Sequence, residues 1–205
     1  MIRRPDDPAD PMTTMLTHAT TLTHDAIAAL IPHSGAMCLL ARLERWDARR
    51  IVCSATNHRD ADHPLRTRRG LLAACAIEYA AQAMALHGAL LGQAAGTQAT
   101  PGFLASARGV QLHVMRLDDL PILTAAVQGA GAGDNAGSEA NDASASGDDS
   151  NDDWSNAAHN PDALRIEATR QAGDANQILY AFRVSHAGRP IADGRAAVVL
   201  NTALA

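Results

Sequence analysis

A long apolar segment near the middle of the chain most constrains the fold. From Leu71 to Leu91 the residues are mainly Ala and Leu, which predicts one long helix. Its length approaches that of a membrane span, but Glu78, Gln82 and His87 interrupt it and small residues dominate. We therefore expect a buried helix that is wrapped by a sheet, and no membrane span.

The segments around this helix predict β-strands. We expect a short helix that Thr23 caps, and we expect Gly109 to form a bulge or bend in one strand. The helix covers residues 23–30, and the strands cover residues 37–46, 50–56, 103–117, 122–130, 164–171, 177–186 and 190–200. An antiparallel sheet curled around a single helix satisfies this order. The expected fold class is α+β, with an antiparallel sheet wrapped around one long central helix.

Two segments have compositions that are typical of disorder. Residues 1–22 are rich in Pro, Asp and Thr, and residues 131–162 consist largely of Gly, Ala, Asn, Asp and Ser. Such segments bury too little apolar surface to offset the entropy lost on ordering. The strands after residue 162 are too few for an independent core. We expect a disordered tail, then a single domain over residues 23–205 with a disordered insertion at 131–162.

Charge and cysteine content exclude several classes of function. The formal net charge is -5, which argues against nonspecific nucleic-acid binding. The three cysteines form no CxxC pair, so neither a disulfide framework nor a zinc site is indicated, and we expect no metal. The first residues lack the apolar stretch of a signal peptide. These features together predict a cytoplasmic protein.

Two ionisable residues are candidates for acid/base chemistry. His33 stands between Pro32 and Gly35, which restrict the loop, and histidine is the residue type suited to take up and return a proton at cellular pH. Glu78 lies within the apolar helix, where a carboxylate is expensive to bury and its protonated form is favoured. Gln82 lies four residues later on the same helix face and can orient Glu78.

The segments that carry these residues resemble the bacterial 3-hydroxyacyl-[acyl-carrier-protein] dehydratases. The run IPHSGAMCLL, which contains His33, is similar to their Leu-Pro-His-Arg-x-Pro-Phe-Leu-Leu segment. The helical run ending IEYAAQ, which contains Glu78, is similar to their segment ending Val-Glu-Ala-x-Ala-Gln. The pattern resembles still more closely the dehydratase-like hotdog proteins of aryl-polyene and related pigment pathways.

This resemblance implies the hotdog fold for the single domain, a reaction and an assembly. His33 would remove the C2 proton of a 3-hydroxyacyl thioester while Glu78 assists departure of the C3 hydroxyl, with no cofactor. Backbone N–H groups near Gly70 and Leu71 would polarise the thioester carbonyl, and Tyr79 would narrow the acyl tunnel. The protein would act as a homodimer or a heterodimer with another hotdog subunit. The His and the acid would come from different subunits.

A basic loop precedes the helix. Its arginines suit the phosphopantetheine arm or the acidic face of an acyl carrier protein. They are Arg59, Arg66, Arg68 and Arg69. The same loop departs from the dehydratase pattern, because His63 and Pro64 stand where those enzymes carry a His-Phe-Pro-Gly-x-Pro stretch.

Two other functions fit the same sequence. A hotdog thioesterase would use the helix carboxylate to activate water, although the position of His33 favours dehydration. A noncatalytic subunit that stabilises a related dehydratase is compatible with the altered loop.

Overall fold

The computed structural model of the chain describes residues 21–97, 102–123, 160–174 and 176–200. In these residues a seven-stranded antiparallel sheet, in the order β1-β2-β3-β5-β6-β7-β4, packs against the long helix α2 (Ala76–Ala94). The strands are β1 (Leu22–Thr23), β2 (Arg42–Trp46), β3 (Arg50–Ala55), β4 (Gly102–Leu112), β5 (Leu164–Gly173), β6 (Gln177–His186) and β7 (Arg189–Leu200). The short helix α1 (His24–Ala28) precedes β2, and three 3-10 turns cover Gly35–Met37, Asn57–Arg59 and Ala73–Cys75.

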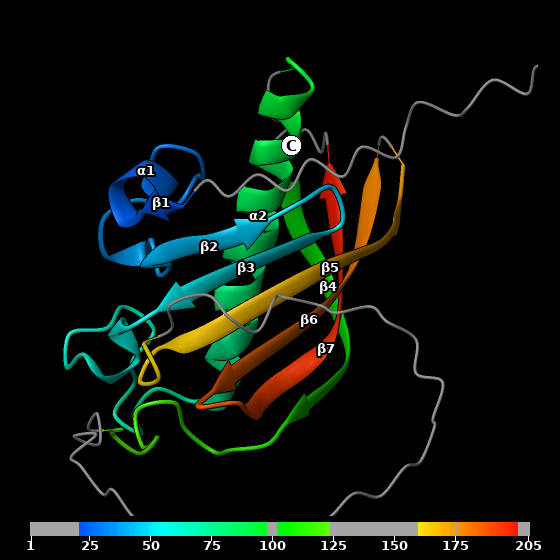
Figure 1. Cartoon of the computed structure of the whole chain (residues 1–205). Helices are drawn as coiled ribbons and strands as arrows, with labels where there is room; N and C mark the ends of the chain where they lie inside the picture. Colours follow the sequence, from blue (N-terminus) through cyan, green and yellow to red (C-terminus); the bar gives the residue numbers. More distant parts are fainter. Residues whose placement is uncertain (1–20, 98–101, 124–159, 175, 201–205) are drawn as a thin grey trace, which may run out of the picture.

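The sheet wraps α2 and buries it (Figure 1). Alternate residues of the central strands face the helix, so that Leu164, Ile166 and Ala168 of β5 are fully buried. Arg165 and Glu167, which lie between them, pair with each other on the other face. This alternation explains why strands with many polar residues still form a core. The predicted α+β hotdog architecture is confirmed.

Tertiary contacts shift the boundaries of several predicted elements. The strand expected from Met37 begins only at Arg42, because the Gln82 side chain on α2 hydrogen-bonds to the Met37 carbonyl and the Leu39 N–H. The strand expected to end at Leu117 ends at Leu112. The helix expected from Leu71 begins at Ala76, after a 3-10 turn. No helix among the described residues is long and apolar enough to cross a membrane.

The expected disordered segments lie largely outside the described residues. Leu22, placed in the predicted tail, pairs with Leu43 and starts the sheet. Asp162, placed in the predicted insertion, is also ordered, because both its oxygens accept hydrogen bonds from Arg59 at 2.8 and 2.9 Å. The Leu123 N–H donates to the same carboxylate at 3.1 Å. Asp162 therefore joins the two described chain ends that flank residues 124–159. The predicted strand at 122–130 falls mostly within that undescribed stretch, and Ile122 and Leu123 form no strand.

A buried histidine beside this junction makes stability depend on pH. His58 is fully buried, and its two ring nitrogens have no hydrogen-bond partner among the described residues. Its ring packs edge-on against His186 at a centroid distance of 5.8 Å. Burial lowers the pKa of His58 to about 4. The native protein therefore protonates His58 at lower pH than the unfolded chain does. The free energy of unfolding consequently decreases as pH falls from about 6.5 towards 4.

We expect His58→Phe to reduce the acid sensitivity of the fold. Between about pH 7 and pH 5, His58 should account for a loss of roughly 2 kcal/mol in the free energy of unfolding. Urea titrations of wild type and variant at both pH values measure this difference. The exposed His24, changed to Gln, is the control. Equal losses in the wild type and His58→Phe would contradict the prediction.

Candidate active site

His33 and Glu78 meet within a single chain. The Nε2 atom of His33 lies 3.2 Å from Oε1 of Glu78. The imidazole comes from the loop after α1, where the positive φ of Gly35 (56°) turns the backbone, and the carboxylate comes from the first turn of α2. The two side chains are 26% and 31% exposed, so a ligand can reach them. Within one chain these two groups are in contact, whereas the resemblance implied that different subunits supply them.

Gln82 fixes the geometry of this pair. Its Nε2 donates to Oε1 of Glu78 at 3.0 Å and to the Met37 carbonyl at 2.8 Å. Its Oε1 accepts from the Leu39 N–H at 2.8 Å. Gln82 is fully buried and thus orients Glu78, as its spacing predicted, while it ties the loop that carries His33 to the helix.

The two nitrogens of His33 have different surroundings. Nδ1 is buried and has no hydrogen-bond partner among the described residues, whereas Nε2 faces Glu78. Nε2 is therefore the nitrogen through which this ring can exchange a proton with the carboxylate or with a ligand.

A cavity of about 440 Å³ adjoins the pair. Its lining is apolar except for His33, Glu78 and Tyr180. The α2 residues in the lining are Ala81, Met84, Ala85, Gly88 and Ala89. The sheet residues in the lining are Gly102, Phe103, Leu104, Ile178, Tyr180, Val198 and Leu200. Leu30 and Pro32 complete the lining beside the imidazole. An apolar cavity with an imidazole and a carboxylate in its lining can hold a hydrocarbon group next to a proton-transfer centre.

The polar group of Tyr180 is already occupied. Its hydroxyl lies 3.0 Å from Nδ1 of His87, and Nε2 of His87 lies 2.7 Å from the Asp47 carbonyl. Because a carbonyl can only accept, Nε2 of His87 carries the proton and Tyr180 donates to Nδ1. His87, which interrupts the apolar helix, therefore holds one wall of the cavity in place.

The sequence contained a signal for the helix wall that the sequence analysis did not use. Ala81, Ala85 and Ala89 follow Glu78 at spacings of three or four residues, so they share its helix face. The contributions of β4, β6 and β7 had no such signal, because they depend on strand order in the sheet.

Gly70 and Leu71 do not provide free N–H groups. The Leu71 N–H donates to Oδ1 of Asp118 at 3.1 Å, and the Gly70 N–H donates to the Thr67 carbonyl at 3.0 Å. The helix also begins later than expected, at Ala76. Gly70 has a φ of 91°, and a Cβ there would collide with the Arg116 guanidinium. Both N–H groups are thus used in the turn before α2, and neither is free to polarise a thioester carbonyl in this arrangement.

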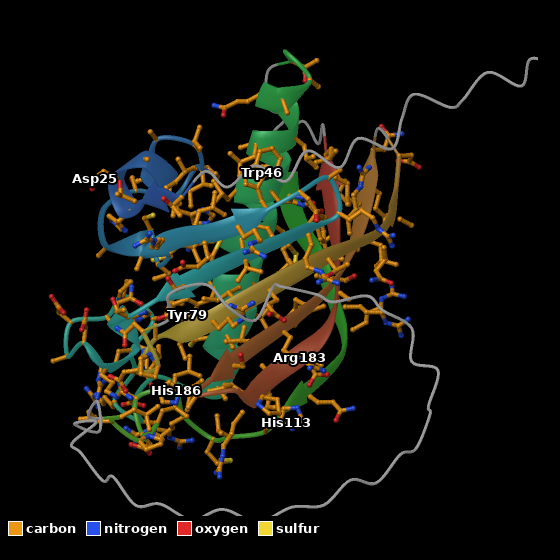
Figure 2. All side chains as sticks on the ribbon, viewed as in Figure 1. Asp25, Trp46, Tyr79, His113, Arg183 and His186 are labelled. Atoms are coloured by element: carbon orange, nitrogen blue, oxygen red, sulfur yellow. The ribbon has the colours of Figure 1, made fainter. Side chains whose placement is uncertain are left out.

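Tyr79 lies outside the cavity, on the side of α2 that faces the loop from β3. Figure 2 places Tyr79 at the same end of the sheet as His186. Its hydroxyl accepts from Nε2 of His63 at 2.9 Å and donates to Asn57 at 2.8 Å, and its ring is fully buried. The expectation that Tyr79 narrows an acyl tunnel is wrong, because the residue that follows Glu78 points to a different helix face. His63, in the loop that differs from the dehydratase pattern, is likewise part of this buried network.

The four arginines of the basic loop have two different environments. Arg59 binds Asp162 and the carbonyls of residues 120 and 121, and Arg66 pairs with Asp118 at 2.8 Å. Arg68 and Arg69 are exposed, and neither forms an ion pair within the described part of the chain. Only these last two remain open to an anionic partner. In the same part of the chain, no group of three or more His, Cys, Asp or Glu side chains is placed to hold a metal ion.

A helix wrapped by an antiparallel sheet, with an imidazole and a carboxylate paired beside an apolar cavity, is the arrangement of a hotdog dehydratase. The family model for ApeP dehydratases matches residues 25–145, which is more than half of the chain and includes His33 and Glu78. The chain belongs to the ApeP-like dehydratase family. No curated protein matches the chain significantly.

Two solved structures are similar to the chain, and the first of them shares its fold. The dehydratase heterocomplex ApeI:P from Xenorhabdus doucetiae aligns with a TM-score of 0.60 at 18% identity, covering 88% of this chain and 92% of that chain. AziG from S. sahachiroi aligns with a TM-score of 0.41 at 15% identity, covering 77% of this chain and 88% of that chain. At 18% identity the first likeness shows the fold alone.

Proposed function

We propose that this chain dehydrates a 3-hydroxyacyl thioester to the 2-enoyl thioester, on a substrate carried by an acyl carrier protein in a polyene or fatty-acid-like pathway. The observation that carries the proposal is the contact between His33 and Glu78 in the lining of an apolar cavity. Membership of the ApeP-like dehydratase family supports the reaction type. The apolar lining supports an acyl substrate.

In this mechanism His33 takes the C2 proton on Nε2, and the electron pair of that C–H bond forms the C2–C3 double bond. The C3–O bond breaks as Glu78 delivers a proton to the hydroxyl, which leaves as water. The elimination of water causes no net oxidation or reduction of the substrate or of the enzyme. The reaction therefore requires no redox cofactor. Gln82 keeps the carboxylate beside the imidazole through the reaction.

Product analysis tests the proposal. The chain is incubated with a 3-hydroxyacyl-carrier-protein, alone and with a second hotdog subunit, and the products are followed by mass spectrometry. Loss of one water from the thioester is the expected result. A free acid and thiol would instead identify a thioesterase. Activity that needs the second subunit and survives His33→Ala would identify a noncatalytic subunit.

We propose further that the partner is a second hotdog subunit that packs along β4. Among the described residues this strand is an outer strand whose one pairing partner is β7, and most of its residues are exposed. Phe103 and Leu104 are 42% and 39% exposed although both line the cavity, so a partner there would complete the cavity wall. Unpaired strand edges favour pairing with another chain. The name of the Xenorhabdus doucetiae structure describes a heterocomplex, which supports a hotdog partner.

Leu112→Asp should weaken this association. Leu112 lies on β4, is 47% exposed and does not line the cavity, so the variant leaves the His33 environment unchanged. A charge in a desolvated interface should raise the dissociation constant of the assembly by at least roughly 10-fold. Sedimentation velocity over a range of concentrations measures this. The prediction fails if wild type and Leu112→Asp have the same oligomeric state throughout.

Arg68 and Arg69 are proposed to contact the carrier protein. Reversal of both charges (Arg68→Glu with Arg69→Glu) should raise KM for the carrier-bound substrate by roughly 3- to 10-fold, because like charges oppose an acidic partner. KM for the corresponding pantetheine thioester should not change. Arg49→Glu, in the exposed turn between β2 and β3, is the control. An unchanged KM for the carrier-bound substrate would remove this role.

A further inference from the structure

The cavity runs along one face of α2, away from the catalytic pair. Glu78, Ala81, Ala85 and Gly88 line it at spacings of three or four residues, followed by Ala89. At about 1.5 Å rise per helical residue, this face spans about 16 Å. The polar groups of the pair lie at one end of the face, and the rest is apolar.

Gly88 has no evident structural reason to be glycine. It lies in the interior of a helix, where glycine is less stable than alanine by roughly 0.5–1 kcal/mol. Its φ is not positive, and a Cβ added there would meet no atom of the described residues within 4 Å. Neither backbone conformation nor packing therefore excludes a side chain. What a larger side chain at this position would occupy is the cavity itself.

The opposite wall suits a hydrocarbon. It is formed by Ile178, Val198 and Leu200, together with Tyr180, whose hydroxyl is bound to His87. Among the lining residues that the structure describes, none in this distant part of the cavity is charged. An unbranched apolar chain that starts at the catalytic pair can extend along α2 without leaving a polar group unsatisfied.

We propose that the acyl chain of the substrate lies along this face of α2 and that Gly88 sets the longest chain the cavity accepts. The placement of the thioester end beside His33 and Glu78 rests on the proposed function. The proposed role of Gly88 in limiting the depth of the cavity does not rest on that function, because this role follows from the cavity lining alone. Gly88 acts on specificity and takes no part in proton transfer.

Binding of saturated acyl-pantetheines tests the proposal without requiring the reaction. Butanoyl, octanoyl and dodecanoyl thioesters are titrated against the full chain, in its native assembly, by calorimetry. In the wild type, affinity should rise with chain length. Gly88→Leu should weaken binding of the longest chain by at least roughly 10-fold, since several buried methylenes are displaced, and should change butanoyl binding by less than about 2-fold.

Gly92→Leu is the matched control, one turn later on α2 and outside the cavity lining. It should leave all three affinities unchanged, and circular dichroism checks that both variants keep their helix. An equal loss for every chain length in Gly88→Leu, or no loss for the longest, would overturn the proposal. If the length-dependent loss is seen but the wild type dehydrates no 3-hydroxyacyl thioester, Gly88 keeps its role and the proposed function falls.

Discussion

His33→Gln and Glu78→Gln are each expected to lower kcat/KM for dehydration by roughly 100- to 10,000-fold, the range that single acid/base groups contribute. Each replacement removes one site of proton transfer while it keeps the size of the side chain. Gln at position 78 can still accept the hydrogen bond from Gln82, so the loop that carries His33 should stay in place. The rate of enoyl thioester formation, measured with a carrier-bound substrate, checks this.

The pair should also act as a unit. The variant with both replacements should be little slower than the worse single variant, because both groups are needed in one elimination step. His24→Gln and Glu167→Gln, which lie outside the cavity lining, are the controls for loss of a similar group elsewhere. Dehydration that continues within 5-fold of wild type in either catalytic variant would disprove the assignment.

Asp118→Asn is expected to lower the free energy of unfolding by about 2 kcal/mol, because one carboxylate joins three neighbours. The Asp118 side chain is 4% exposed and accepts hydrogen bonds from Arg116 and from the Leu71 N–H, while Arg66 lies at 2.8 Å. The amide retains the shape but loses the charge that holds two arginines. Urea unfolding at neutral pH measures the change.

The pH dependence of this contribution has a defined sign. The hydrogen bond from Arg116 lowers the pKa of Asp118 to about 2, below that of an aspartate in the unfolded chain. The stabilisation is therefore complete above about pH 4 and is lost as pH falls towards 2. The difference between wild type and Asp118→Asn should shrink over that interval. Asp119→Asn, whose side chain is 63% exposed, should change stability by less than about 0.5 kcal/mol.

Sequence reasoning about the site succeeded where the relevant spacing was local. The four-residue spacing of Glu78 and Gln82 on a helix predicted their contact, which the structure has at 3.0 Å. It failed for Tyr79, because its neighbourhood to Glu78 in sequence was taken as neighbourhood in space, although successive helical residues point about 100° apart. It also failed for Gly70 and Leu71, whose N–H groups bind partners that sequence separation alone does not reveal.

For the basic loop too, the sequence revealed the local pattern but not the long-range contacts. The sequence showed four arginines close together, and nothing in their spacing distinguished them. The structure separates Arg59 and Arg66, which hold the loop to Asp162 and Asp118, from the exposed Arg68 and Arg69. Their partners are carboxylates far along the chain, which only the folded arrangement brings close.

Hydrophobic periodicity by itself determined the long central helix, the strands around it and the α+β class, because burial of an apolar helix requires a sheet to cover it. The hotdog architecture followed from the resemblance of the segments around His33 and Glu78 to the dehydratases. Local spacing also fixed which residues share the face of Glu78. Only the tertiary structure decided that His33 reaches Glu78 within the same chain, and that β4, β6 and β7 close the cavity. Those contacts depend on strand order and loop packing, which are long-range properties that no local pattern encodes.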